Sequence, residues 1–311
     1  MTKRFAGVLI VSLGLALTAC ASTPVMAVDL SQRRINIVST VGMITDIVRN
    51  VGGERVLVRG LMGPGVDPHL YKPSAGDAIR LGNADIIFYG GLHLEGRMAE
   101  LFEKIELTGK PAVAVSRDIE PARLRQPPEF EGKYDPHIWF DVSLWESAAR
   151  TVAAALTSLD PNSAGLYAAN ARAYLAKLEI LDQYARSQIA TIPASQRVMI
   201  TAHDAFGYFG QAYGMEVRGL QGISTASEIS AADVQSLSEF ITARKIKALF
   251  VESSVPESTV RAVQEAVRSR GHEVVIGGEL FSDAMGAEGT AEGTYIGMVT
   301  FNVDTIVKAL R

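Results

Sequence analysis

The sequence reads Tyr134-Asp135-Pro136-His137-Ile138-Trp139-Phe140-Asp141 between a loop rich in proline and charge and a helical pattern that starts near Val142. Proline fixes its own φ and pushes the preceding residue into an extended conformation, so the Asp-Pro pair is rigid. The bulky Trp139 and Phe140 follow directly. A histidine held between these constraints has few directions in which to point, and we predict that His137 binds a metal ion.

Short apolar stretches of strand character alternate with helical patterns on both sides of this segment. Strands are expected at residues 35–39, 56–60, 85–89 and 112–115, then at 197–201, 217–220, 248–252 and 273–276. Helices are expected at residues 43–51, 74–81, 94–107, 206–213, 231–244, 256–268 and 294–310. This rhythm predicts an α/β protein whose parallel sheets carry helices on both faces.

A long helical pattern separates the two halves. Asp160 and Pro161 suit an N-cap and a first helical position, and Pro193 stops the pattern. Its apolar stripe consists of Tyr167, Ala171, Tyr174, Leu175, Leu178 and Leu181. At 1.5 Å per residue such a helix spans about 45 Å. We interpret residues 160–193 as a linking helix between an N-terminal lobe (33–159) and a C-terminal lobe (194–311); the alternative is a surface helix of a single domain.

The N-terminus has the features of a targeting segment. Lys3 and Arg4 precede an apolar run that is too short to span a membrane, so residues 1–19 are expected to be a signal peptide. Leu17-Thr18-Ala19-Cys20 resembles a bacterial lipobox, and Cys20 is the only cysteine of the chain. We predict that Cys20 is lipidated and that residues 20–32 form a tether; the alternative is plain signal cleavage after Ala27. A single cysteine excludes intramolecular disulfides.

Composition narrows the class of protein. With 311 residues, 48% of them hydrophobic and 21% charged, the chain suits two globular domains. A net charge of −4 argues against a nucleic-acid partner. Only five histidines are present, so folding must assemble any cluster of them.

Ligand side chains collect at the carboxyl ends of strands in open parallel sheets. Asp-Pro-His occurs twice, ending at His69 after the second strand and at His137 beyond the fourth. His203 follows the first strand of the second half, and Asp283 lies beyond the last strand. We therefore predict that His69, His137, His203 and Asp283 bind one metal ion, two ligands coming from each half.

Imidazole suits zinc and also accepts manganese, iron or copper, and a carboxylate adds a harder ligand. Three neutral histidines and one aspartate leave a divalent ion with a net charge of +1, which is tolerable when nearby acceptors orient the rings. The candidates for that role are Asp67, Asp135, Asp204 and Glu252. Asp204 could equally cap a helix, and Glu252 could itself be a ligand. His93 and His272 are predicted to be structural or solvated.

The chain resembles the metal-binding solute-binding proteins of zinc and manganese ABC transporters, most closely the Tro-type members. The resemblance is carried by Val66-Asp67-Pro68-His69, Gly91-Leu92-His93-Leu94-Glu95, residues 135–141, residues 201–206, Val251-Glu252-Ser253-Ser254 and Asp283. It implies two α/β lobes joined by one backbone helix, with the metal held in the cleft by the same four residues. It also implies an envelope location and a membrane permease with a cytoplasmic ATPase as partner. Nothing in the sequence argues against a monomer, and we expect one.

Two features of the sequence leave undecided which metal ion the protein carries. Zinc-dedicated members of the family often carry a long loop rich in histidine and acid, whereas residues 117–133 contain no histidine. Manganese-dedicated members often have glutamate where this chain has His203. We expect both zinc and manganese to bind, and such donors accept Fe²⁺ as well. Affinity is expected to fall steeply below about pH 6, near the ordinary pKa of histidine.

The alternative functions are a zinc hydrolase and a metal-bound surface adhesin. A catalytic zinc usually keeps three protein ligands and one open position for water, whereas four ligands are predicted here. The sequence has no His-Glu-x-x-His motif and no Gly-x-Ser-x-Gly motif. We therefore expect a binding protein rather than an enzyme. An adhesin on the same scaffold would bind host proteins.

Overall fold

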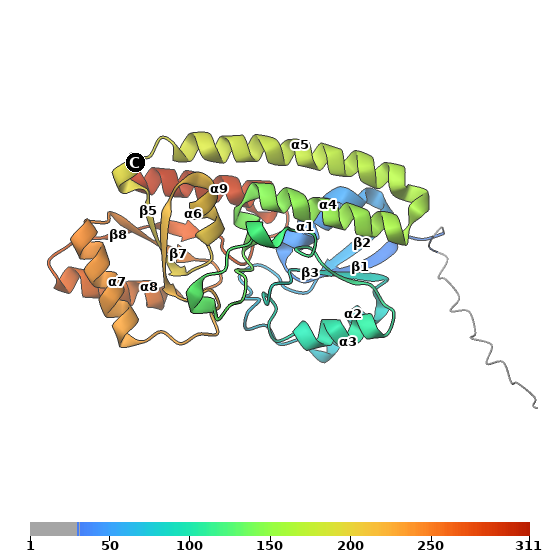
Figure 1. Cartoon of the computed structure of the whole chain (residues 1–311), viewed down its shortest axis with the longest axis horizontal. Helices are drawn as coiled ribbons and strands as arrows, with labels where there is room; N and C mark the ends of the chain where they lie inside the picture. The colour runs from blue at the N-terminus through green and yellow to red at the C-terminus, as the bar shows by residue number, and fades with distance from the viewer. Residues whose placement is uncertain (1–29, 31) are drawn as a thin grey trace, which may run out of the picture.

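The computed structural model describes Leu30 and residues 32–311. The predicted signal peptide, Cys20 and most of the predicted tether lie outside the described residues. The N-terminal lobe contains a parallel sheet with strand order β2-β1-β3-β4 (Figure 1). Its elements are β1 (Ile35–Ser39), α1 (Gly42–Gly52), β2 (Val56–Gly60), α2 (Ala75–Asn83), β3 (Ile86–Tyr89), α3 (Ala99–Leu107) and β4 (Ala112–Ala114).

Helices cover both faces of this sheet, as the alternating pattern predicts. Helix α1 lies on one face, towards the long helices, and α2 and α3 lie on the other (Figure 1). The central strands β1 and β3 are almost wholly buried, which is typical of parallel strands between two helical layers. Ser74 and Asp77 start α2 with a capping box, in which each side chain bonds the other residue's backbone N–H.

The C-terminal lobe contains two parallel strand pairs, β5-β6 and β7-β8. Strand β5 lies beside β7, so the pairs together form one layer of the lobe (Figure 1). Its elements are β5 (Val198–His203), α6 (Gly207–Tyr213), β6 (Glu216–Gln221), α7 (Ala231–Arg244), β7 (Ala248–Glu252), α8 (Glu257–Ser269), β8 (Val275–Leu280) and α9 (Tyr295–Leu310). The carboxyl ends of the strands in both lobes face the region between the lobes.

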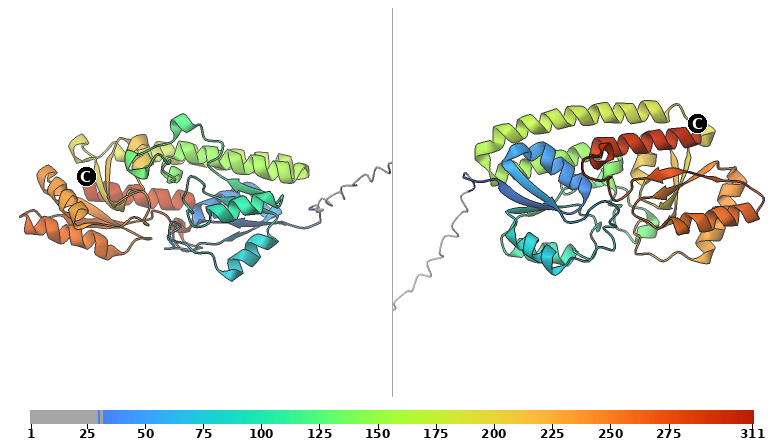
Figure 2. Two further views of the ribbon diagram at one scale, coloured as in Figure 1. Left: turned by 60° about the horizontal axis from the view of Figure 1, so that its bottom comes forward. Right: turned by 180° about the vertical axis from the view of Figure 1, so that it is seen from behind.

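One long helix, α5 (Ala164–Ile189), runs across both lobes (Figure 2). It packs on α4 (Val142–Leu159) of the N-terminal lobe and on α9 of the C-terminal lobe. Its 26 residues span about 39 Å. The larger of two apolar clusters runs without a break from β1 through α4 and α5 to α9. The two-lobed α/β architecture with a long linking helix is therefore confirmed, while the exact divisions at residues 33, 160 and 194 stay predictions.

The linking helix begins where the sequence predicts, with Asp160 as N-cap and Pro161 as first residue, but its first turn, Pro161–Ser163, is a 3-10 helix that runs directly into α5. The Asp160 side chain makes no capping hydrogen bond. The Asp160 carboxylate instead accepts hydrogen bonds from Arg55 Nε at 2.7 Å and from the Tyr167 hydroxyl at 3.0 Å. A buried carboxylate gains more from a charged partner than from capping a helix, so tertiary contacts override the local signal.

Two predicted boundaries are wrong. Helix α3 begins at Ala99 and not near residue 94, because residues 92–98 form turns, with a positive φ at Leu92 and His93. Strand β8 continues through the glycines that we placed after it. At Gly277 an added Cβ would lie 2.8 Å from the Ala309 Cβ, so glycine here allows α9 to pack closely on the strand.

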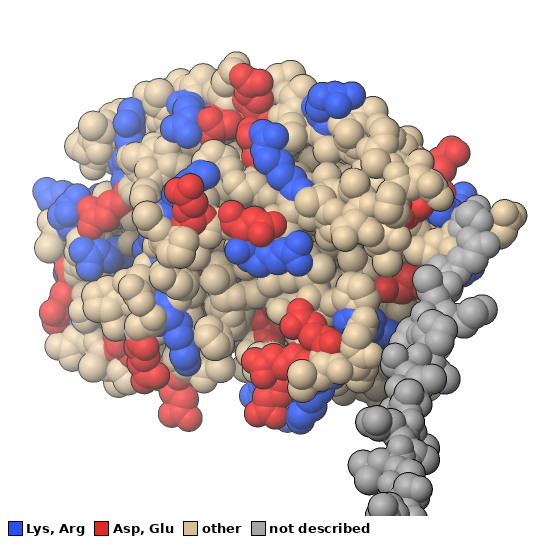
Figure 3. Space-filling view, turned by 45° about the vertical axis from the view of Figure 1, so that its right-hand side comes forward, with Lys and Arg blue, Asp and Glu red and all other residues tan. Residues whose placement is uncertain are grey.

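Charged side chains of both signs are interspersed on the face shown in Figure 3. That distribution fits the small net charge of −4 and gives this face no continuous basic surface. Among the described residues, none of the helices combines the length and the apolar character that crossing a bilayer requires.

Candidate metal centre

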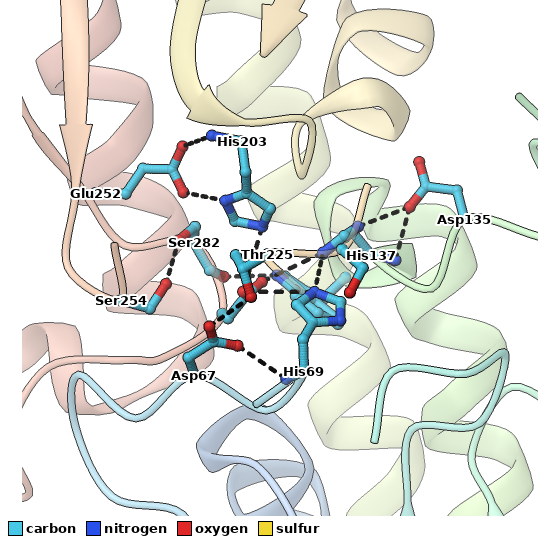
Figure 4. A network of polar contacts seen from close by, with 12 residues as sticks. Asp67, His69, Asp135, His137, His203, Thr225, Glu252, Ser254 and Ser282 are labelled. Atoms are coloured by element: carbon cyan, nitrogen blue, oxygen red, sulfur yellow. Dashed lines mark hydrogen bonds and ion pairs between the residues drawn. The ribbon is translucent and has the colours of Figure 1, made fainter. Parts of the chain in front are cut away.

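His69 lies in the loop between β2 and α2. The Asp67 carboxylate accepts the backbone N–H of His69 at 2.8 Å and a hydrogen bond from the Thr225 hydroxyl of the other lobe (Figure 4). Asp67 therefore fixes the backbone of this loop and not the imidazole ring. Among the described residues, Nδ1 of His69 has no hydrogen-bond partner. The ring is directed by its burial, since His69 is only 4% exposed.

His137 directly precedes the 3-10 turn Ile138–Phe140. One oxygen of Asp135, Oδ1, accepts both the His137 backbone N–H at 3.0 Å and ring Nδ1 at 2.8 Å. The Trp139 ring meets the imidazole edge-on, with centroids 5.2 Å apart. In the neutral ring, donation by Nδ1 to Asp135 leaves Nε2 without a proton, so Nε2 is the nitrogen that can bind a metal.

His203 is the last residue of β5, and Glu252 is the last residue of the neighbouring strand β7. The Glu252 carboxylate accepts the His203 backbone N–H at 2.9 Å and ring Nδ1 at 2.5 Å. Glu252 thus orients the His203 ring in the way that Asp135 orients the His137 ring. The Asp135 and Glu252 carboxylates are both buried, so their charge-assisted hydrogen bonds to the two rings are protected from water.

The rings of His69, His137 and His203 converge (Figure 4), and Asp283, in the loop after β8, lies against all three. Its carboxylate oxygens lie 3.2 Å from Nε2 of His203, 3.3 Å from Nε2 of His137 and 3.7 Å from Nε2 of His69. One ligand atom from each of these four residues can be chosen so that all lie within 4.8 Å of one another. The four residues that the sequence pattern selected therefore meet at one point between the lobes.

Several of these polar atoms lack a hydrogen-bond partner among the described residues. They are Nε2 of His203 and both carboxylate oxygens of Asp283. An unpaired buried polar atom is costly, and such atoms are rare in folded proteins. Three nitrogen donors and a carboxylate around one point form the donor set that a divalent transition metal accepts.

The charges of the cluster favour ionised Asp283. Burial by itself raises the pKa of Asp283, but His203 and His137 hold it well below its usual range. Burial lowers the pKa of His137, yet its hydrogen bond to Asp135 and the nearby Asp283 carboxylate raise it to about 9. Burial likewise opposes the charged form of His203, and Glu252 and Asp283 raise its pKa well above the ordinary value. His69, without such a carboxylate on Nδ1, has its pKa lowered by burial to about 3.

Asp204 does not take the place that the sequence suggested. Its backbone N–H donates to the carbonyls of Gln221 and Gly222, and the N-cap of α6 is Phe206. Among the described residues its carboxylate makes no hydrogen bond to the four clustered side chains. His93 is exposed in the loop before α3, and the His272 ring lies 2.9 Å from the Ile246 carbonyl, so neither joins the cluster.

Three contacts near the cluster escaped the sequence analysis. Thr225 bonds to Asp67, Arg125 pairs with Asp135, and Trp139 Nε1 donates to the Ser282 carbonyl at 3.0 Å. Thr225 and Arg125 lie in irregular segments that carry no motif. The bulk of the Trp139 side chain is evident from the sequence, but its N–H also links the segment of His137 to Ser282, the residue before Asp283.

Replacing Glu252 with glutamine tests its orienting role. The amide keeps the size of the side chain but weakens the charge-assisted bond to His203, so zinc affinity is expected to fall about ten- to a hundredfold. Isothermal titration with a competing chelator measures the change. Glu257→Gln, at an exposed carboxylate at the start of α8, is the matched control. Equal affinities of the two variants would contradict this role of Glu252.

Comparison with known proteins places the chain in a family. Residues 37–309 match the family described as ZnuA, zinc-uptake complex component A, periplasmic. The zinc-binding protein TroA of Treponema pallidum is 54% identical over 274 residues, covering 88% of each chain. The manganese-binding lipoprotein MntA of Bacillus subtilis is 46% identical over 297 residues, covering 95% of each.

The fold also matches that of a solved structure of this family. The solved structure of the periplasmic zinc-binding protein TroA from Treponema pallidum superposes with a TM-score of 0.87 at 52% identity, covering 89% of this chain and 99% of that one. The strand-end cluster, the two lobes and the long helix thus occur together in a chain whose sequence matches along nearly its whole described length. This protein belongs to the ZnuA family of periplasmic metal-binding components of ABC transporters.

Proposed function

We propose that this protein captures a divalent transition metal ion, zinc or manganese, outside the cytoplasm and delivers it to the permease of an ABC transporter. The observation that carries the proposal is the convergence of four buried donor side chains from both lobes within 4.8 Å of one another. Family membership supports the transport context, because component A of a zinc-uptake complex and relatives named as substrate-binding lipoproteins of metal ABC transporters share this sequence pattern. We propose a membrane permease with its cytoplasmic ATPase as the partner.

Each residue of the centre has a role in this proposal. His69, His137 and His203 bind the ion through Nε2, and Asp283 binds it through its carboxylate. Asp135 and Glu252 orient two of the rings, and Asp67 holds the loop of His69. The ion itself then joins the lobes, since two ligands come from each side.

Zinc and manganese are both proposed as cargo. Relatives with 54% and 46% identity are named for zinc and manganese respectively, so identity alone does not divide them. Three imidazoles favour zinc, and divalent affinities generally rise from manganese through iron to copper, with zinc above manganese. Zinc is therefore expected to bind more tightly in vitro whichever ion the cell delivers, and Fe²⁺ fits the same donors.

The geometry favours binding over catalysis. Four protein donors satisfy a tetrahedral zinc, whereas a hydrolytic zinc keeps a position for water. All four side chains are at most 4% exposed, which leaves no approach for a substrate in this conformation. We propose that the protein is not an enzyme.

Elemental analysis tests the proposal most directly. Protein purified from its native envelope without chelators is expected to contain about one zinc or manganese ion per chain. The chain lacking its four donors, with His69, His137, His203 and Asp283 all changed to alanine, is the control and is expected to contain none. Metal-free wild-type protein from cells grown with sufficient zinc and manganese would overturn the proposal.

Substitution at His203 tests which residue sets the choice of metal. His203→Glu adds a hard carboxylate ligand, so the ratio of zinc to manganese affinity is expected to fall about tenfold or more. Glu252 lies 2.5 Å from the His203 ring, so Glu252→Gln is added to avoid two facing carboxylates. Competition titrations measure both ions, with Glu252→Gln alone as the control. An unchanged ratio would argue against His203 as a ligand.

We also propose that the protein is a monomer anchored to the outer face of the cytoplasmic membrane through lipidated Cys20. Relatives named as lipoproteins support an anchored, extracytoplasmic location. Two or more acyl chains give a stable anchor. Cys20→Ala is expected to abolish fatty-acid labelling and move the protein from the membrane to the soluble fraction. Unchanged labelling and fractionation would contradict lipidation at Cys20.

A further inference from the structure

Arg125 lies next to the metal centre although it contacts no proposed ligand. Its guanidinium Nη1 donates to Oδ2 of Asp135, and the other oxygen of that carboxylate accepts His137 Nδ1 at 2.8 Å. The Asp135 backbone N–H also donates to the Arg125 carbonyl at 2.9 Å, which closes the loop between them. Arg125 is thus one hydrogen bond removed from the ring of His137, and it holds the free oxygen of Asp135.

The guanidinium packs on the other lobe. An added Cβ at Gly207, the first residue of α6, would lie 1.3 Å from Arg125 Nη1 and 2.0 Å from Cζ. Every other residue would therefore displace the guanidinium. The Arg125 side chain is 24% exposed, whereas the Asp135 side chain with which it pairs is fully buried.

Tyr208, the next residue of α6, makes a second connection between the same partners. Its hydroxyl donates to the Asp135 carbonyl at 3.0 Å and accepts the Arg125 backbone N–H at 3.0 Å. The Arg125 Cζ lies 5.7 Å from the centroid of the Tyr208 ring. The segment that carries His137 is therefore bonded to α6 through a side chain and through two backbone groups.

We propose that Arg125, packed against Gly207, is a positioning residue that couples the direction of His137 to the position of α6. Since His137 belongs to the N-terminal lobe and α6 to the C-terminal lobe, the ring points at the ion only when the two lobes are in this arrangement. A small displacement of α6 would release Arg125, then Asp135, then the ring. The apolar cluster that runs through both lobes would stay intact, so the ion could be released without separating them.

This inference rests on the proposed ligand role of His137. The test compares Arg125→Gln, which removes the cation, with Gly207→Ala, which leaves Arg125 but fills the space it occupies. Zinc affinity of both variants is expected to fall about ten- to a hundredfold, as for other residues that hold a ligand in place. Arg123→Gln is the matched control, because Arg123 lies in the same loop and, among the described residues, its guanidinium has a hydrogen bond only to the Ser143 hydroxyl. Its affinity is expected to equal the wild-type value.

A double-mutant cycle with His137→Ala separates positioning from general damage. If Arg125 acts through His137, Arg125→Gln causes no further loss of affinity once His137 is alanine. Wild-type affinity of Arg125→Gln, or an undiminished loss in the His137→Ala background, would overturn the proposal. His137→Ala with wild-type affinity would instead refute the proposed ligand set, and this inference with it. If Gly207→Ala does not fold, the Arg125→Gln cycle still decides.

Discussion

Replacing Asp283 with alanine is expected to weaken zinc binding by on the order of a hundred- to a thousandfold. A structural zinc site of four ligands binds with about 10–16 kcal/mol, so one ligand carries about 2.5–4 kcal/mol. Asp283 is the sole negatively charged donor of the four. Without it the ion keeps its full double charge in a buried site, where solvation by water is lost.

Competition with a fluorescent zinc chelator at a fixed pH measures this change. Glu279→Gln is the matched control, because Glu279 is an exposed carboxylate on β8, four residues before Asp283. Its affinity is expected to equal the wild-type value. Asp283→Asn adds a graded case, since its amide oxygen can still bind but carries no charge. Zinc affinity of Asp283→Ala within a factor of two or three of wild type would remove Asp283 from the centre.

The sequence was sufficient to predict the cluster because strand ends in a parallel sheet share one edge. The two Asp-Pro-His triplets follow strand ends, and His203 ends β5, so all three histidines are expected at this edge. The structure brings them together. The rule needs only the existence and order of the strands. Asp283 was found in the same way although β8 extends four residues beyond its predicted end, because the loop after it still reaches the same edge.

Details that depend on tertiary contacts could not be predicted. Asp160 precedes a proline in the manner of a helix cap, yet its carboxylate pairs with Arg55, which lies 105 residues away in the sequence. Asp67 and Asp135 stand in identical Asp-Pro-His triplets, yet only Asp135 reaches the imidazole ring. The triplet fixes the backbone turn in both cases. The direction of the ring depends on what packs around it, which local sequence does not contain.

The affinity for zinc is expected to depend on pH well above the ordinary pKa of histidine. A metal binds only the unprotonated ring, so every histidine that is charged in the metal-free protein must lose a proton. The pKa of His137 is raised to about 9 and that of His203 is also raised, whereas the pKa of His69 is lowered to about 3. Below the raised pKa values of His137 and His203, binding should therefore release about two protons, from these two rings and not from His69.

These pKa shifts determine the direction in which zinc affinity changes with pH. As pH falls from 8 to 6, protons compete at two rings while Asp283 stays ionised, so affinity should decrease by on the order of ten-thousandfold, about a hundredfold per pH unit. Ordinary pKa values would instead place the whole decrease below about pH 6. Dissociation constants between pH 5.5 and 8.5, corrected for protonation of the competing chelator, distinguish the two cases, and calorimetry in two buffers of different ionisation heat counts the protons. Glu252→Gln removes a carboxylate that raises the pKa of His203, so its slope should be lower by up to one proton. A flat profile from pH 8 to pH 5 would mean that these histidines do not bind the ion.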